Sequence, residues 1–304
     1  MTDSPSPYRY RGRFAPSPTG PLHIGSLVAA VGSFLEARRR GGQWLLRIED
    51  VDAPRCSAEA ADGILRTLEA FGFAWDGTVA WQSRRAAAYD RALERLQAAR
   101  QVFPCACTRK ELADSAIAPD GAAIYPGTCR NGLPPDREAR AWRLRVGDRK
   151  VVFDDAVQGR IESDLAREAG DFILRRADRL HAYQLAVVVD DAEAGVTAVV
   201  RGADLLTSTA RQIYLQRCLG FPTPGYAHLP VAVNAEGEKL SKQTLARPLD
   251  CAHPSPQLLA VLRFLGQAPP ADLAAAGVDE VWRWALDNWR LDRVPRGPAP
   301  CPVA

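Results

Sequence analysis

RFAPSPTGPLHIGS, residues 13–26, reads as an extended arm, a glycine turn and the beginning of a helix. Pro16 and Pro18 favour an extended backbone before them. An apolar stripe with helical spacing follows: Leu27, Val31, Phe34 and Leu35. The N-terminus of such a helix offers backbone N–H groups and a positive dipole end to a phosphate. His23 could donate a hydrogen bond to that phosphate, and Gly25 has no side chain to obstruct a base or ribose. An ordinary turn with a surface histidine would explain the same residues.

The composition is that of a globular protein with one large domain or two smaller ones. The chain has 304 residues, of which 47% are hydrophobic and 25% are charged. No apolar run approaches the ~18 residues of a membrane span, and the first residues do not resemble a signal peptide. We therefore expect a cytoplasmic protein without a membrane partner. The net charge of +3 neither requires nor excludes a nucleic-acid partner.

Lysine is rare among the basic residues of this chain. Only four of the 39 Lys and Arg residues are lysines, and two of them, Lys239 and Lys242, lie together in EKLSKQ, residues 238–243. A lysine kept among so many arginines indicates a site that needs a compact ammonium group. This polar segment is a candidate phosphate clamp, although short lysine-containing loops are common without such a role.

Two predicted strands are followed by charged residues that could meet a ligand. The strand Gln43–Ile48 comes after the first helix and precedes Glu49, and the strand Val196–Val200 precedes Arg201. Strand, helix and strand in this order begin a parallel α/β fold, and ligands bind at the carboxyl ends of its strands. Glu49 is therefore a candidate partner for an ammonium group and Arg201 for a carboxylate.

Each of these two residues also has a simpler interpretation. Glu49 could cap a loop without touching any ligand. Arg201 could form a salt bridge with one of two aspartates, Asp204 or Asp190.

Three of the seven cysteines form a candidate zinc site. An odd number of scattered cysteines argues against a disulfide framework. Cys105, Cys107 and Cys129 could supply three thiolates to a tetrahedral zinc ion, which needs a fourth ligand. Tyr125 could be that ligand as a phenolate, or it could be an ordinary packed ring. The C-x-C spacing is tighter than the usual zinc pattern, so the residues alone leave both interpretations open.

The rest of the chain divides into five expected regions. They are a first half of the parallel α/β domain (9–100), an inserted α+β piece (101–165), a second half with the KLSKQ loop (166–250), C-terminal helices (251–294) and a disordered proline-rich tail (295–304). In the inserted piece we expect a hairpin of strands Trp142–Val146 and Val151–Phe153. The parallel sheet should then resume at Asp171–Arg175. The run Tyr183–Val189 fits a helix or a strand. We expect Thr207 or Ser208 to cap the helix that comes after the strand Val196–Val200.

Residues 13–26 and 239–243 resemble the two signatures of the class I aminoacyl-tRNA synthetases, in their glutamyl/glutaminyl form. HIGS matches the HIGH signature at its first three positions, with Ser26 in place of the second histidine. KLSKQ matches the KMSKS signature at both lysines. With RIED and VVRGADLL between the signatures, the resemblance covers about residues 9–250.

The resemblance implies a Rossmann-type parallel sheet with an inserted zinc-binding α+β subdomain and a short C-terminal helical region. It implies the activation of L-glutamate with ATP and Mg²⁺. The implied glutamate site consists of Arg13, Phe14, Ala15, Pro16, Ser17, Glu49, Tyr183 and Arg201. The implied ATP site consists of His23, Gly25, Lys239, Ser241 and Lys242, among which His23, Lys239 and Lys242 act in catalysis. One structural zinc ion would be held by Cys105, Cys107, Tyr125 and Cys129.

About 60 residues follow KLSKQ, where a glutamyl-tRNA synthetase carries a long anticodon-binding region. The chain is thus similar to the stand-alone catalytic domains of this group, which attach glutamate to the queuosine base in the anticodon of tRNA(Asp). We expect that activity, from a monomer. The alternatives are a minimal synthetase that charges the 3′ end of tRNA(Glu), a non-catalytic RNA-binding paralogue, and a nucleotidyltransferase of the same architecture.

Overall fold

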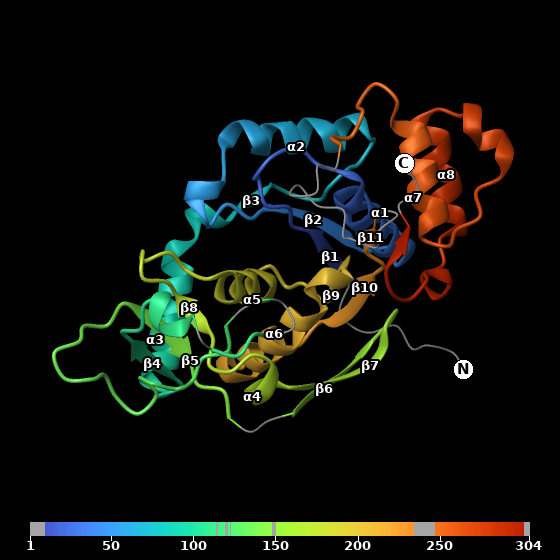
Figure 1. Cartoon of the computed structure of the whole chain (residues 1–304). Coiled ribbons are helices and arrows are strands. Elements are labelled where there is room, and N and C mark those ends of the chain that lie inside the picture. The colour runs from blue at the N-terminus through green and yellow to red at the C-terminus, as the bar shows by residue number, and fades with distance from the viewer. Residues whose placement is uncertain are drawn as a thin grey trace.

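A mostly parallel layer of strands with helices on both faces forms the centre of the chain (Figure 1). The structure is a computed structural model that describes residues 10–113, 115–118, 121, 123–147, 150–233 and 247–300. For residues 299 and 300 it describes the backbone alone. The expected α/β fold with a parallel sheet is confirmed.

Two sheets lie edge to edge in the central layer. The first contains, in order, β1 (Arg11–Phe14), β2 (Gln43–Ile48) and β3 (Ala80–Trp81), all parallel. The second contains β7 (Gly159–Asp164), β6 (Lys150–Asp155), β10 (Gly225–Leu229) and β9 (Ala198–Gly202), with β7 antiparallel and the others parallel. The Thr197 amide donates to the Arg11 carbonyl at 2.9 Å and so joins β1 to the β9 side. The carboxyl ends of β1, β2, β9 and β10 consequently meet at one edge of the layer.

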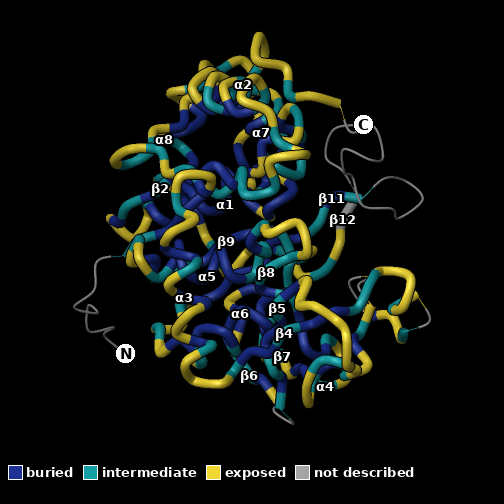
Figure 2. The backbone as a smooth tube through the Cα atoms, turned by 90° about the vertical axis from the view of Figure 1, so that its left-hand side faces the viewer, coloured by how far each residue is buried: buried dark blue, intermediate teal, exposed yellow. Residues whose placement is uncertain are grey.

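Helices enclose a separate hydrophobic core on each face of this layer. The helices are α1 (Ile24–Arg39), α2 (Ala58–Ala70), α3 (Ala86–Ala98), α4 (Leu165–Glu168), α5 (Tyr183–Glu193), α6 (Leu206–Leu219), α7 (Pro254–Phe264) and α8 (Val278–Asn288). One core is formed by α1, α2, α7 and α8, and the other by α3, α5 and α6. Val200 belongs to the first core and Val199 to the second, as the alternation of side chains along a strand requires. In Figure 2 the backbone is mostly buried where α1, β9 and α5 follow one another across the middle of the molecule.

A small antiparallel sheet lies beside the central layer, and it corrects two expectations. It consists of β4 (Val102–Cys105), β5 (Ala141–Leu144) and β8 (Ile173–Arg175). The predicted hairpin of Trp142–Val146 with Val151–Phe153 is therefore wrong, because β6 pairs instead with β7 and β10. The prediction that the parallel sheet resumes at Asp171–Arg175 is wrong as well. The periodicity of a strand identifies the strand but not its partner, which depends on residues far away in the sequence.

Three local differences have simple physical reasons. The run Tyr183–Val189 begins helix α5, and its five residues from Leu185 on are all buried, so no polar face revealed the helical period. Neither Thr207 nor Ser208 caps α6, whose N-cap is Leu205. The expectation of a disordered tail is wrong for β12 (Ala299–Pro300), which pairs with β11 (Ala232–Val233).

None of the helices in the described part of the chain is both long and apolar enough to cross a membrane. The division into five regions is not decided by these sheets and stays a prediction.

Candidate active site

A cavity of about 440 Å³ lies at the carboxyl ends of β1, β2 and β9, next to the N-termini of α1 and α5. The predicted glutamate and ATP residues that the structure describes all line it: Arg13, Phe14, Ala15, Pro16, Ser17, His23, Gly25, Glu49, Tyr183 and Arg201. The other three, Lys239, Ser241 and Lys242, lie outside the described residues. The volume is in the range of ligand-binding clefts, about 300–1,000 Å³. One cavity therefore collects chemistry from four separate parts of the chain.

His23 is the N-cap of α1, at the wall of this cavity. Its Nδ1 accepts a hydrogen bond from the Gly25 amide at 3.1 Å. The neutral imidazole then carries its proton on Nε2, which is the atom that could donate to a phosphate oxygen. The Gly25 amide, by contrast, is already engaged by the cap. The Leu249 amide donates to the Leu22 carbonyl at 3.0 Å, which holds the chain after residue 246 beside this turn.

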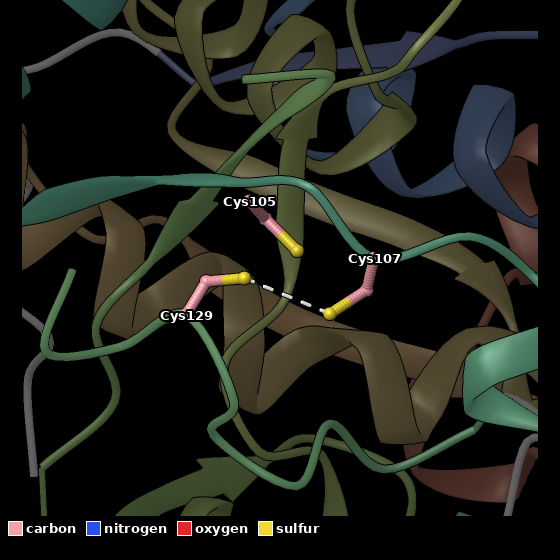
Figure 3. A group of neighbouring side chains, drawn as sticks. All are labelled: Cys105, Cys107 and Cys129. Carbon is pink, nitrogen blue, oxygen red and sulfur yellow. Dashed lines mark hydrogen bonds between the residues drawn. The ribbon is translucent and has the colours of Figure 1, made fainter. Parts of the chain in front are cut away.

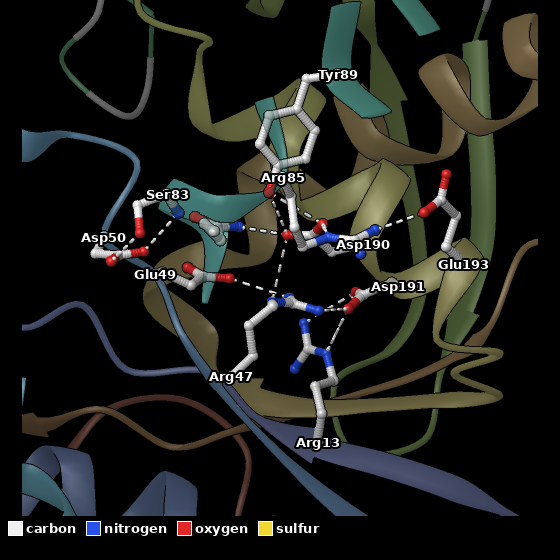
Figure 4. A network of polar contacts seen from close by, with 11 residues as sticks. Arg13, Arg47, Glu49, Asp50, Ser83, Arg85, Tyr89, Asp190, Asp191 and Glu193 are labelled. Carbon is white, nitrogen blue, oxygen red and sulfur yellow. Dashed lines mark hydrogen bonds and ion pairs between the residues drawn. The ribbon is translucent and has the colours of Figure 1, made fainter. Parts of the chain in front are cut away.

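Arg13 and Glu49 are fixed by two residues outside the predicted set (Figure 4). Asp191 on α5 accepts hydrogen bonds from Arg13 Nε and Nη2 at 3.2 Å and from Arg47 Nη1 at 2.7 Å. Arg47 Nη2 donates to Glu49 Oε1 at 3.0 Å. All four side chains are buried. In the described residues Arg13 Nη1 donates to no acceptor, so the Arg13 guanidinium keeps donor capacity for a ligand.

The pKa values of the two carboxylates in this network, Asp191 and Glu49, shift in opposite directions. Burial alone would raise the pKa of Asp191, but the Arg13 and Arg47 guanidinium groups outweigh burial and lower that pKa. Burial raises the pKa of Glu49, and the attraction of Arg47 and Arg13 only partly offsets it. A cationic ligand beside Glu49 would favour its ionised form further, as an ammonium group does.

Asp190, the neighbour of Asp191, ties the network to the second core. It accepts hydrogen bonds from Gln82 Nε2 at 2.8 Å, from Arg85 Nε at 2.5 Å and from the Tyr89 hydroxyl at 2.9 Å. Arg47 Nε lies 3.7 Å from the same carboxylate. Arg47 is thus connected through Asp190 to Arg85 and to Tyr89 on α3.

Arg201 is held by neutral partners. Its Nε donates to His228 Nε2 at 3.1 Å, and its Nη2 donates to Thr209 Oγ1 at 2.7 Å. Its Nη1 is buried and has no hydrogen-bond partner in the described residues. Asp190, one of the two salt-bridge partners considered from the sequence, contacts Arg85 and Arg47 instead. A buried guanidinium with an unused nitrogen at a cavity wall fits a carboxylate ligand.

Tyr183 is the first residue of α5 and lines the same cavity. Burial raises the pKa of its phenol, and the nearby Arg201 charge only partly opposes this. The hydroxyl therefore keeps its proton at neutral pH and can donate a hydrogen bond to a bound substrate.

The predicted zinc ligands come together at the end of β4 and the segment that follows it (Figure 3). The three sulfur atoms of Cys105, Cys107 and Cys129 lie within 4.8 Å of one another, with 3.7 Å between the Sγ atoms of Cys107 and Cys129. The Tyr125 hydroxyl lies 3.5 Å from Cys105 Sγ and 3.6 Å from Cys107 Sγ. None of these four residues lines the cavity described above.

Three N–H donors surround this cysteine cluster, which we define as Cys105, Cys107, Tyr125 and Cys129. The Cys129 amide donates to the Tyr125 oxygen at 2.7 Å, the Ala106 amide to Cys129 Sγ at 3.5 Å, and Arg143 Nε to Cys105 Sγ at 3.3 Å. Such N–H donors orient the sulfur and oxygen atoms, as hydrogen bonds to metal ligands commonly do.

Comparisons with known proteins agree with this geometry. A family model described as tRNA synthetases class I (E and Q), catalytic domain, matches residues 9–257. The glutamyl-Q tRNA(Asp) synthetase of Aromatoleum aromaticum is 63% identical over 97% of this chain and 93% of that protein. That of Dechloromonas aromatica is 62% identical over 94% of this chain and 96% of that protein. This chain belongs to the glutamyl-Q tRNA(Asp) synthetase family of class I tRNA synthetases.

The fold of this family member is also that of a longer synthetase. The crystal structure of the glutamate-tRNA synthetase from Elizabethkingia anophelis matches with a TM-score of 0.79 and 26% sequence identity. The match covers 96% of this chain and 68% of that one. Membership of the family makes the chain a ligase of the aminoacyl-tRNA synthetase type.

Sequence reasoning missed the residues that hold the ligand-facing groups in this synthetase: Asp191, Arg47 and His228. Arg47 did give a signal, because it is a charged residue that follows the apolar run Trp44–Leu46 within the strand QWLLRI. Asp191 gave a similar one as the second acid of an acidic pair that follows three valines. Charged residues at such positions indicate buried pairs, but the sequence does not reveal which residue pairs with which.

Proposed function

We propose that this chain activates L-glutamate with ATP and transfers the glutamyl group to the queuosine base in the anticodon of tRNA(Asp), in the cytoplasm. The observation that carries the proposal is the charge pattern of the cavity. The cavity is lined by two buried arginines, Arg13 and Arg201, each with a nitrogen that donates to no acceptor among the described residues, and by one buried carboxylate, Glu49. Glutamate has two carboxylates and one ammonium group, so its charges complement these three side chains.

Each group of the substrate then has a partner. Arg13 and Arg201 bind the carboxylates, Glu49 binds the α-ammonium group, and the Tyr183 hydroxyl donates to the substrate. The loop Phe14–Ser17 closes the side of the pocket. A hydrogen bond of 2.9 Å from the Glu49 amide to the Pro16 carbonyl supports this placement, because it ties the loop to the end of β2.

Activation joins the glutamate α-carboxylate to the α-phosphorus of ATP and releases pyrophosphate. The carboxylate is already ionised at neutral pH, so the step needs no general base. Negative charge grows on the phosphate oxygens in the transition state. His23 Nε2–H and the N-terminus of α1 lie at the cavity wall to stabilise it, and we assign the same task to Lys239 and Lys242. Class I synthetases use ATP with Mg²⁺, which neutralises phosphate charge when bound.

The RNA acceptor is proposed from the relatives. Several proteins that are 56–63% identical over nearly the whole chain are named glutamyl-Q tRNA(Asp) synthetase. The same fold in a glutamate-tRNA synthetase supports one competing acceptor, the 3′ end of tRNA(Glu). We propose that the chain acts as a monomer.

We also propose that the cysteine cluster holds one structural zinc ion. A tetrahedral site with Zn–S near 2.3 Å and Zn–O near 2.0 Å requires sulfurs about 3.8 Å apart and sulfur–oxygen distances of about 3.5 Å. The observed 3.7 Å between Cys107 and Cys129, and 3.5 Å and 3.6 Å to the Tyr125 oxygen, fit that geometry. The ion would connect the end of β4 to the segment that carries Tyr125 and Cys129.

The decisive experiment offers the enzyme ATP, labelled glutamate and three RNAs: queuosine-containing tRNA(Asp), unmodified tRNA(Asp) and tRNA(Glu). We expect label only on the queuosine-containing tRNA(Asp), and nuclease digestion should locate it in the anticodon fragment. Label on the terminal adenosine of tRNA(Glu) would contradict the proposal and identify a 3′-charging synthetase. Labelling of unmodified tRNA(Asp) would contradict the role of queuosine.

A further inference from the structure

Arg201 is the end of a row of hydrogen bonds that crosses three neighbouring strands. Asp155 is the last residue of β6, His228 lies on β10 and Arg201 on β9. His228 and Arg201 are direct partners in the parallel pairing of β10 with β9. The Asp155 and His228 side chains lie 2.6 Å apart, between Oδ2 and Nδ1, and Arg201 Nε follows at 3.1 Å from His228 Nε2. All three side chains are buried, and His228 is 0% exposed.

The direction of the hydrogen bonds in this row follows from the chemistry of its two ends. Arg201 Nε–H can only donate, so His228 Nε2 must accept. A histidine with an acceptor at Nε2 carries its proton on Nδ1, which then donates to the Asp155 carboxylate. A proton on Nε2 would place two N–H groups against each other at 3.1 Å. Thr209 Oγ1, 3.0 Å from the same nitrogen, would then have to accept that proton although it already accepts from Arg201 Nη2.

Asp155 is itself fixed and cannot rotate away from its histidine. Its Oδ1 accepts hydrogen bonds from the amides of Val157 at 3.0 Å, Gln158 at 2.8 Å and His228 at 3.1 Å. Only Oδ2 is therefore available to His228 Nδ1. The tight turn between β6 and β7 thus sets the orientation of the carboxylate, and the carboxylate sets the proton position on the imidazole.

His228 influences the cavity by orienting the guanidinium group of Arg201. His228 fixes Arg201 Nε, and Thr209 Oγ1 fixes Arg201 Nη2 at 2.7 Å. These contacts leave Nη1 as the nitrogen without an acceptor in the described residues. Because the guanidinium is planar, fixing two nitrogens determines where the third one points.

We propose that Asp155 and His228 are positioning residues for glutamate recognition, which hold Arg201 so that its Nη1 meets a substrate carboxylate. The inference rests on the proposed role of Arg201 in glutamate binding. Neither residue touches substrate; Asp155 selects the Nδ1–H tautomer of His228, and that tautomer supplies the lone pair that orients Arg201. Burial and the Arg201 charge lower the pKa of His228, although Asp155 has the opposite effect. The lowered pKa keeps the imidazole neutral.

The variant Asp155→Asn tests this tautomer control. Because three amides point at Oδ1, the asparagine must place its carbonyl oxygen there and its NH₂ group at the former Oδ2 position. The NH₂ group then faces His228 Nδ1, which forces the proton to Nε2 and against Arg201 Nε–H. We expect the KM for glutamate in ATP–pyrophosphate exchange to rise about 10- to 100-fold, with the KM for ATP changed less than about 3-fold.

The matched control is Asp171→Asn, a second buried aspartate that accepts a hydrogen bond from the Val146 amide and lies outside the cavity. It should leave the KM for glutamate within about 2-fold of the wild type. Equal increases in the two variants would show a general effect of losing a buried carboxylate and would overturn the proposal. An unchanged KM in a folded Asp155→Asn variant would overturn it as well.

A measurement on the wild type keeps the proposal falsifiable if Asp155→Asn does not fold. In ¹⁵N-histidine NMR spectra, with His228 assigned by its loss in His228→Gln, we expect a proton on Nδ1 and a bare Nε2. A proton on Nε2 would overturn the proposal. Failure of the proposed function would be seen separately, as wild-type pyrophosphate exchange that does not depend on glutamate. The tautomer measurement does not depend on that function.

Discussion

The cavity that we propose binds glutamate, called the pocket below, and the cysteine cluster differ in what holds their polar groups. In the pocket, each charged side chain has a partner from the chain itself: Asp191 joins Arg13 to Arg47, and Arg47 holds Glu49. In the cysteine cluster, three sulfurs and one phenol oxygen face one another, and Arg143 is the cation that reaches a sulfur, at 3.3 Å. The pocket is thus preorganised by folding alone, whereas the cluster fits an arrangement completed by an ion.

The largest effect should come from removing the shared carboxylate of the pocket. Asp191→Ala leaves Arg13 and Arg47 without the carboxylate that both contact, and breaking such a buried pair costs about 3–5 kcal/mol. We expect this loss in the free energy of unfolding in urea. The control Asp178→Ala removes an exposed partner of Arg176 and should cost below about 1 kcal/mol. A similar small loss for Asp191→Ala would show that the pocket is not preorganised by this pair.

The next effect concerns activity rather than stability. Arg201→Ala removes the guanidinium group proposed to bind a substrate carboxylate, and we expect kcat/KM for glutamate to fall about 10²- to 10³-fold. Arg160→Ala, at an exposed arginine paired with Glu162 outside the cavity, should retain the wild-type value. Wild-type exchange activity in Arg201→Ala would remove Arg201 from the glutamate site.

A pH-dependent effect should follow from the Asp155 carboxylate. Burial pushes its pKa upward, but hydrogen bonds from His228 and from backbone amides outweigh burial and lower the pKa to about 2. A lowered folded-state pKa stabilises the protein above the unfolded pKa of about 4, and this stabilisation is lost as the pH falls from about 4 to 2. The contribution is about 2 kcal/mol. The difference in unfolding free energy between wild type and Asp155→Asn should therefore shrink from pH 6 to pH 3; a constant difference would contradict the assignment.

The smallest effect should come from the fourth member of the cysteine cluster. Tyr125→Phe removes one proposed ligand oxygen and should weaken zinc binding about 10-fold in a competition titration with a chromogenic chelator. Cys107→Ser should weaken it more, and Cys251→Ser, at an exposed cysteine outside the cluster, should leave it unchanged. Pyrophosphate exchange should stay within about 3-fold in all three variants, because none of these residues lines the cavity. A large loss of exchange in Tyr125→Phe would show that the two regions are coupled.

The predicted pocket residues that the structure describes line one cavity, and their place depends on short-range rules. Glu49 and Arg201 follow or end strands whose carboxyl ends meet at one edge, and His23 precedes a helix. These features need only the residues within one or two turns.

The sequence did not predict partners that lie far apart. Arg13 and Asp191 are 178 residues apart, and Asp155 and His228 are 73 residues apart. The same limit explains the wrong hairpin of β5 with β6. A buried charge signals that it needs a counter-charge, but many residues could supply one.

The sequence by itself determined the α/β class, the helix that follows the first signature, and the types of group that the described part of the pocket offers. Only the tertiary structure decided which groups pair, which nitrogen of Arg201 has no acceptor among the described residues, and on which nitrogen His228 carries its proton. The physical reason is that helices, caps and strands depend on local hydrogen bonds and periodicity. Ionisation and tautomers depend instead on burial and on the few polar atoms that the fold brings within about 3 Å.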